Sequence, residues 1–228
     1  MTEAFKQFLD LSEQDRRDVF EAAASRLDTL PSYVEKDFWV CLVLDLLYNR
    51  MPDGHHSLLF KGGTSLSKAF GLIRRFSEDI DVVVYRDKLG FEGDRDPTLA
   101  GTLSNKKRNA LFEELKAACS RYILGDLKAA LTTLFAEMVD GCQVGPDEDD
   151  ADRQTLLIEY PTLYPNPDVA YVLPRVKIEA GARSALDPNL RCAVTRRSGR
   201  SPRGDAQPAE ALRHPGPARQ PARRGGAV

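Results

Sequence analysis

The chain has 228 residues, of which 42% are hydrophobic and 29% charged, and its formal net charge is −2. This size allows one substantial domain or two small ones. The charge is uneven, because nine arginines and only two acids follow Leu190, which leaves a net charge of about −9 on the preceding residues. An acidic body argues against non-specific nucleic-acid binding by bulk charge and leaves room for a local basic groove.

The cysteines and the longest apolar run narrow the class of protein further. The four cysteines are scattered without a C-x-x-C pair, so neither a disulfide framework nor a zinc site is expected. The N-terminus lacks an apolar signal core. The run FWVCLVLDLLY, residues 38–48, is too short to cross a bilayer and contains Asp45. These features predict a soluble cytoplasmic protein.

Two helices are predicted near the N-terminus. Ser12 precedes the first, over residues 13–27, and is a typical helix-capping residue. The second helix, over residues 30–50, is nearly apolar through its centre, so we expect it to cross the core. Ser32 and Glu35 have the spacing of a capping box at its start.

The next stretch combines a strand, a glycine turn, a helix and a second strand. Residues 57–63, SLLFKGG, read as a short buried strand that ends in the turn, and residues 64–76 read as a helix. The strand SEDIDVVVY follows over residues 77–85. Alternation along it places Asp79 and Asp81 on one face, opposite the apolar side chains.

A polar stretch over residues 86–106 is expected to form a loop or lid, and two helices are predicted over 105–124 and 126–138. Residues 145–153, GPDEDDADR, form an acidic loop. A calcium site is conceivable there, but the spacing and central glycine of an EF-hand are absent, so we expect a solvated linker.

Two further strands are predicted over residues 153–161 and 169–184. In the second, Arg175, Lys177 and Glu179 share one face.

The acidic residues of these strands suggest a metal site. Asp79 and Asp81 point the same way on one strand, and Mg²⁺ is commonly held by carboxylates together with substrate phosphates. A third carboxylate on a neighbouring strand would complete the site, and Glu179 is the best candidate. Lys177, on the same face, could neutralise phosphate charge.

The glycine turn suggests a place for the phosphates. Gly62 and Gly63 leave backbone amides open ahead of a helix, Thr64 and Ser65 add hydroxyl donors, and Lys68 follows about one turn later. Each feature alone is often only structural. Their order predicts a nucleoside triphosphate site beside a metal. The segment matches neither a Walker A loop nor a dinucleotide-binding fingerprint.

The composition changes after Leu190. Arginine, proline, alanine and glycine dominate, and large apolar residues almost disappear, so this part cannot bury enough surface to fold. We therefore expect a folded domain over residues 1–189 and a disordered tail over 190–228. The tail is either a natural basic segment that contacts nucleic acid or the product of a reading-frame slip in a GC-rich gene. The abrupt change favours the slip.

Three segments resemble the AbiEii family, the toxin components of type IV toxin–antitoxin and abortive-infection systems. They are EKDFWVCLVL at 35–44, LLFKGGTSLSKAFGLIRRFSEDIDVVV at 58–84 and VKIEAGARS at 176–184, and the likeness covers roughly residues 30–184. The family consists of nucleotidyltransferases of the polymerase-beta-like superfamily. The resemblance implies an α/β (α+β) fold with a mixed sheet flanked by helices, Mg²⁺ dependence and use of a nucleoside triphosphate.

The resemblance also assigns roles to individual residues. Gly63 and Ser65 would belong to the nucleotide loop, Asp79 and Asp81 would bind metal, and Glu179 would be the third acidic position. Family members continue past the GARS strand into a C-terminal helical region with a motif resembling FWEK. This chain shows no such motif after residue 184, which makes that region a missing part of the expected fold.

Two pairs of charged residues lie close to these motifs. For Lys36 two interpretations stand side by side, a reach into the active site and a surface position. For Asp37 we expect the surface position, next to core aromatics. Arg74 and Arg75 could contact nucleic-acid phosphates or lie on a solvated helix face.

Three functions are compatible with these motifs. The preferred one is a metal-dependent toxin that transfers a nucleotide, from GTP or a pyrimidine triphosphate, to an RNA (tRNA) or protein acceptor, with a cognate antitoxin as partner. In the second, a truncated, non-catalytic remnant binds the triphosphate or the antitoxin without turnover. In the third, the acceptor is a small molecule such as an antibiotic.

Overall fold

The computed structural model describes residues 2–68, 79–99, 103–165 and 173–184. The predictions for the second half of the helix over 64–76, for Arg74 and Arg75, and for the tail lie outside these residues. The described helices and strands are, in chain order, α1 (Thr2–Leu9), α2 (Glu13–Leu27), α3 (Pro31–Asn49), β1 (Leu58–Lys61), α4 (Gly62–Lys68), β2 (Asp79–Val84), η1 (Asp87–Leu89), η2 (Gly93–Arg95), α5 (Asn105–Tyr122), η3 (Ile123–Leu127), α6 (Lys128–Ala136), β3 (Gln143–Pro146), β4 (Thr155–Glu159) and β5 (Arg175–Gly181).

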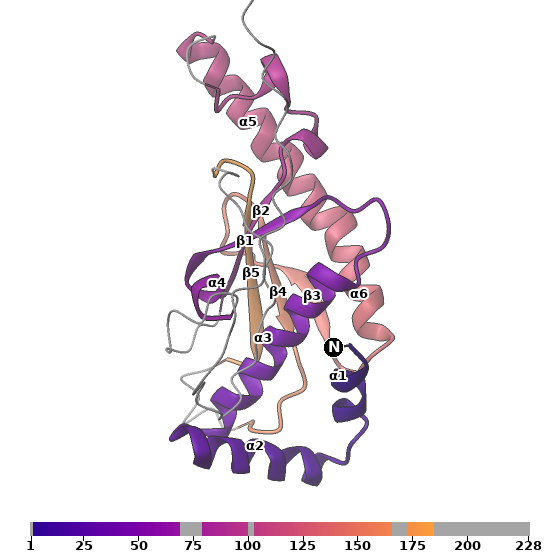
Figure 1. The fold of residues 1–228 in the computed structure, drawn as a ribbon. Helices are drawn as coiled ribbons and strands as arrows, with labels where there is room; N and C mark the ends of the chain where they lie inside the picture. The colour runs from indigo at the N-terminus through magenta and orange to yellow at the C-terminus, as the bar shows by residue number, and fades with distance from the viewer. Residues whose placement is uncertain (1, 69–78, 100–102, 166–172, 185–228) are drawn as a thin grey trace, which may run out of the picture.

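The strands form one five-stranded sheet in the order β1-β2-β5-β4-β3 (Figure 1). β2 and β5 are parallel, and the other neighbouring pairs are antiparallel. The predicted mixed sheet with flanking helices is therefore confirmed. The sequence pattern did not reveal β3, because its four residues include a glycine and a proline, which are rare in strands.

The N-terminal helices form for different local reasons. The hydroxyl oxygen of Ser12 accepts a hydrogen bond from the Asp15 amide at 3.1 Å, which confirms the predicted cap of α2. The predicted capping box of α3 is wrong. This helix begins after Leu30 with Pro31 in its first turn, where the missing amide hydrogen costs nothing, and Glu35 is buried and contacts other parts of the chain.

α3 runs along the sheet and supplies much of the core, as predicted (Figure 1). Residues 35–47 are all buried, and the helix contacts β2 and β5. On the sheet, Ile80, Val82 and Ile178 are fully buried in the same cluster. The Trp39 ring stacks on Tyr160 with the ring centroids 4.8 Å apart. Because these strand residues point into the core, their sequence neighbours point to the opposite face.

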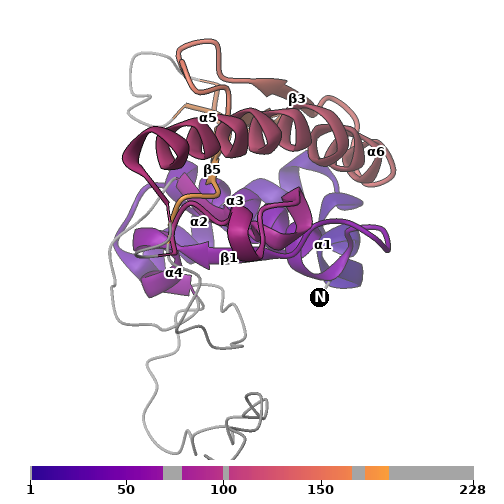
Figure 2. The ribbon, with the colours of Figure 1, turned by 90° about the horizontal axis from the view of Figure 1, so that it is seen from above.

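The predicted pair of helices over 105–138 is one continuous helical segment. α5 passes through the π-helical turn η3 into α6, and Figure 2 shows them in line. η3 contacts β4, and α6 contacts β3 and α3. The described part of the preceding polar stretch includes two short 3-10 turns and a buried Phe91.

None of the helices in the described ranges combines the length and the apolar character needed to span a bilayer. The side chains of Cys41 and Cys119 are buried thiols.

Candidate active site

The acidic residues predicted as metal ligands lie on two adjacent strands. In the parallel pairing of β2 with β5, Asp79 is opposite Lys177 and Asp81 is opposite Glu179. Residues in register on neighbouring strands point to the same face of a sheet. The four charged side chains therefore share the face opposite the core, as the sequence predicts, although Asp81 and Glu179 are 98 positions apart in the sequence.

Asp81 is the more enclosed member of the aspartate pair. Asp79 is exposed, whereas Asp81 is partly buried. Burial raises the pKa of Asp81. The ammonium of Lys61, whose nitrogen lies 3.9 Å from the carboxylate oxygen, opposes that shift, and the negative charge of Glu179 adds to it. The charge of Asp81 is thus sensitive to any cation that approaches this face.

Lys61 is a site residue that the sequence interpretation did not single out. It lies opposite Asp81 in the antiparallel pairing of β1 with β2. The sequence feature that could have identified Lys61 is its position directly before the glycine turn. The register that brings it to Asp81 also depends on the segment that connects the two strands.

The glycine turn lies directly against the metal-ligand candidates. Gly62 has a φ of +73°, and a Cβ atom at this position would lie only 1.9 Å from a carboxylate oxygen of Asp81. A side chain there would meet both backbone strain and a steric clash. The close approach of Gly62 to Asp81 explains why the turn needs glycine.

The two hydroxyls after the turn are already hydrogen-bonded. Thr64 donates to the backbone carbonyl of Asp79, and Ser65 donates to the carbonyl of Gly62 at 2.8 Å. Both side chains are buried. They hold the turn in place beside β2, and nucleotide binding by Gly63, Thr64 and Ser65 stays a prediction.

Lys68 and Asp37 lie in the interior. The Lys68 side chain is 3% exposed, and its ammonium forms an ion pair with the carboxylate of Asp37. This position differs from the surface position expected for Asp37, whereas nucleotide binding by Lys68 stays a prediction. Lys36 is also buried, and it donates to the backbone carbonyls of Leu173, at 3.1 Å, and Arg175.

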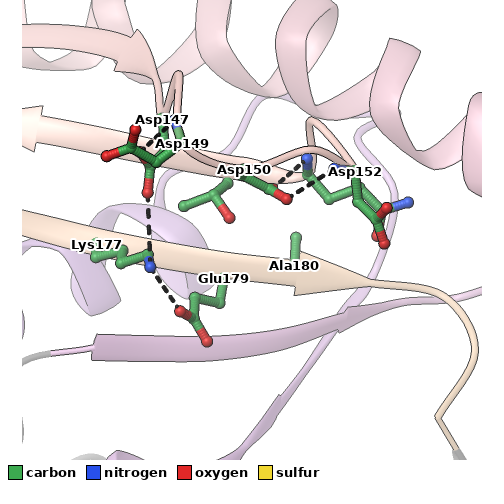
Figure 3. A pocket seen from close by; sticks show the side chains of 9 residues that line it. Asp147, Asp149, Asp150, Asp152, Lys177, Glu179 and Ala180 are labelled. Carbon is green, nitrogen blue, oxygen red and sulfur yellow. Dashed lines mark hydrogen bonds and ion pairs between the residues drawn. The ribbon is translucent and has the colours of Figure 1, made fainter.

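Lys177 joins the sheet to the acidic loop. Its ammonium lies 2.8 Å from Glu179 and 3.5 Å from Asp147, between the two carboxylates in Figure 3. The hydrogen bond with Glu179 is the main cause that raises the pKa of Lys177, and Asp147 adds to it. Lys177 therefore stays charged and connects Glu179 to the acidic loop.

A polar pocket of about 410 Å³ opens between the acidic loop and β5 (Figure 3). The linker expected over 145–153 is thus a wall of this pocket. Asp150 orders the loop by accepting hydrogen bonds from the amides of Asp152, at 2.9 Å, and Gln154, at 2.8 Å. The pocket is lined by Asp147, Asp149, Asp150, Asp152, Gln154, Thr155, Lys177, Glu179 and Ala180.

The donors on the shared face fit a hard divalent cation by their chemistry. Asp79, Asp81 and Glu179 offer only oxygen ligands, which Mg²⁺ prefers, and the like charges of Asp81 and Glu179 influence each other. Within the described ranges, however, there is no group of three or more side chains of the types His, Cys, Asp or Glu that lie close enough together to hold a metal ion. The carboxylates share a face without forming a closed cage.

A mixed sheet that presents acidic residues from two parallel strands beside a glycine turn is the arrangement expected of a nucleotidyltransferase domain. The family model described as nucleotidyl transferase AbiEii toxin, type IV TA system, matches residues 45–210, which is more than half of the chain. The chain therefore belongs to the AbiEii family of nucleotidyltransferase toxins. Searches of curated proteins and of solved structures returned no match.

Proposed function

We propose that this chain is a metal-dependent toxin that transfers a nucleotide from a triphosphate, GTP or a pyrimidine nucleotide, to an RNA or protein acceptor. The observation that carries the proposal is the register of Asp81 with Glu179 on adjacent parallel strands, with Gly62 packed against Asp81. Membership of the AbiEii family supports the reaction class and an antitoxin partner. A tRNA end is the RNA acceptor that we favour.

Each group at the site has a proposed role. Asp79, Asp81 and Glu179 would hold Mg²⁺, which would draw charge from the phosphate oxygens. The turn over Gly62–Ser65 would hold the triphosphate. Lys61 and Lys177 lie where they can offset the negative charge that develops on phosphate. A direct phosphate contact by Lys68 stays a prediction.

The transfer itself balances with the groups present. The acceptor hydroxyl oxygen forms a bond to the α-phosphorus, the bond from that phosphorus to the bridging oxygen breaks, and pyrophosphate leaves with the electron pair. The hydroxyl proton needs a carboxylate acceptor. We assign that role to Glu179, which lies on the same face as Asp81 and is oriented by the Lys177 ammonium at 2.8 Å.

The test is a labelled-nucleotide transfer assay with Mg²⁺, in which total RNA and total protein are offered as acceptors. We expect Asp81→Asn, which keeps the size of the side chain, to lower transfer about a hundredfold or more and to relieve growth inhibition. The matched control is Glu159→Gln, an exposed carboxylate on β4 of the same sheet.

The outcomes separate the possible functions. Unchanged transfer by Asp81→Asn would refute the assigned site. Triphosphate binding without product in the parent protein would instead favour the non-catalytic remnant.

A further inference from the structure

Three consecutive charged residues near the start of α3 are buried. Each forms hydrogen bonds or an ion pair with a different segment of the chain. Glu35 accepts hydrogen bonds from the Thr162 hydroxyl at 2.5 Å and from the Leu163 amide at 2.8 Å. Lys36 donates to carbonyls at the start of β5, and Asp37 pairs with Lys68. Successive side chains on a helix point about 100° apart, so one turn of α3 can reach three separate segments.

The Asp37–Lys68 pair connects α3 to the candidate metal ligands through α4. Gly62 is the first residue of α4, and the described part of this helix reaches Lys68. Between them, the Thr64 hydroxyl is bonded to the carbonyl of Asp79. At the other end of α4, Gly62 is pressed against the Asp81 side chain.

Short helices are marginally stable on their own in water, so the position of α4 depends on its contacts with the rest of the fold. The ion pair with Asp37 is such a contact, and both charges are buried, at 9% exposure for Asp37 and 3% for Lys68. Buried ion pairs add little net stability compared with apolar replacements, but they impose a defined geometry on the segments that they join. A packed pair of apolar side chains would fill the same space, but it would not fix the orientation of α4 relative to α3.

Lys36 anchors the other half of the site. Its bond to the carbonyl of Arg175 lies at the first residue of β5, two and four residues before Lys177 and Glu179. Adjacent residues of one helix thus hold both the glycine turn and the strand with the third carboxylate.

We infer that the buried Asp37–Lys68 pair is a positioning element that sets the glycine turn against Asp79 and Asp81, with Lys36 doing the same for β5. This inference rests on the proposed transfer reaction. Lys68 then acts through α4, without touching the triphosphate. Loss of the pair would misplace the turn that holds the triphosphate, so that turnover falls further than triphosphate affinity.

The test compares four forms of the full chain: the parent, Asp37→Leu, Lys68→Met and the double variant. Each single change removes one member of the buried ion pair and lowers the melting temperature, whereas the double change removes both charges and restores it. We expect the affinity of the double variant for GTP, CTP or UTP with Mg²⁺ to fall by less than about tenfold, because the turn is shifted and its backbone and hydroxyl groups are all retained. The turnover of the double variant falls roughly tenfold to a hundredfold, because small misplacements of reacting groups are costly.

Two more variants complete the comparison. Lys68→Arg keeps the charge and recovers part of the turnover. The control is Arg95→Met with Glu114→Gln, an ion pair on the surface whose side chains are 58% and 56% exposed, and it leaves turnover unchanged.

Three outcomes overturn the inference. A double variant that transfers nucleotides like the parent shows that the pair does not position the turn. A double variant that does not fold shows that the pair serves the stability of the fold. Weakened triphosphate binding in Lys68→Met, but not in Asp37→Leu, shows that Lys68 contacts the phosphate.

Failure of the proposed function is separable from failure of this inference. A parent protein that transfers none of the three nucleotides refutes the proposed function. Hydrogen exchange then decides the inference: residues 58–68 and 79–84 exchange faster in the double variant if the pair positions α4. Unchanged exchange there contradicts it.

Discussion

At the scale of single residues, Gly62 is tightly limited by its surroundings. Its φ of +73° and the 1.9 Å that would separate an added Cβ atom from the Asp81 oxygen leave no room for a side chain. Gly54 provides a matched comparison, because it has a φ of +91° but nothing within 4 Å of the same position. An alanine at either position would have a strained backbone conformation, but only at position 62 would it also clash with Asp81.

We therefore predict that Gly54→Ala costs about 1 kcal/mol of stability and leaves nucleotide transfer unchanged. Gly62→Ala is expected to abolish transfer, since the added methyl group must displace the Asp81 carboxylate. Melting curves and the labelled-transfer assay measure the two effects. Equal transfer by both alanine variants would show that contact between the turn and Asp81 is unimportant.

Glu35 gives a prediction about pH. Its carboxylate is buried beneath Thr162, and this burial raises its pKa above the ordinary value of 4.5 despite the hydrogen bonds that it accepts. A raised folded-state pKa stabilises the fold below the unfolded-state pKa, and this contribution disappears as the pH rises through the folded-state pKa. Glutamine cannot titrate, so Glu35→Gln should lack this pH dependence.

The measurement is the melting temperature of the parent and of Glu35→Gln between pH 4 and pH 7. Relative to the variant, the parent should lose stability as the pH rises above about 4.5. A difference between the two proteins that stays constant with pH would contradict the raised pKa.

At the scale of elements, the sequence predicts best where a local period decides the structure. Alternation along β2 and β5 placed the carboxylates correctly, because one buried face fixes which side chains point outward. Lys61 was missed because its contact with Asp81 depends on strand register. The Asp37–Lys68 pair was missed because residues 31 positions apart meet only after the tertiary fold has formed.

The two helices predicted over 105–124 and 126–138 form one continuous segment in the structure, and the residue at their junction is Gly125. The structure places it within the π-turn η3, with nothing within 4 Å of an added Cβ. We predict that Gly125→Ala stabilises the protein by about 0.5 to 1 kcal/mol, since alanine loses less backbone entropy in a helix. Gly141→Ala, at a φ of +86°, should destabilise it in the same denaturation experiment. A destabilising Gly125→Ala would argue against a continuous helix.

At the scale of the whole molecule, the core of the described residues extends from Phe5 to Ala182 and joins α1, α3, the sheet and the α5–α6 segment. The predicted boundary at residue 189 lies just after it. We expect a chain that ends at residue 189 to melt at the same temperature as the full chain, whereas one that ends at residue 174 loses β5 and does not fold. A large drop in melting temperature for the longer chain would show that residues after 189 belong to the folded domain.

The overall architecture was accessible from the sequence because the order of strand, turn, helix and strand is specific and resembles a known family. The family match covers this order and extends to residue 210. The pocket beside Glu179 was not accessible, because the acidic loop that forms its wall has no periodicity of its own and is placed by Lys177.

The central claim, that Asp81 and Glu179 bind one divalent cation together, is tested most directly by titration of Mg²⁺ into the triphosphate-bound protein. The comparison uses Asp81→Asn, Glu179→Gln and the double variant, with Glu159→Gln as control. We predict that each single site change weakens Mg²⁺ binding about tenfold or more and that the double change adds little, because both residues hold the same ion. Parent-like Mg²⁺ affinity in Glu179→Gln would contradict the account.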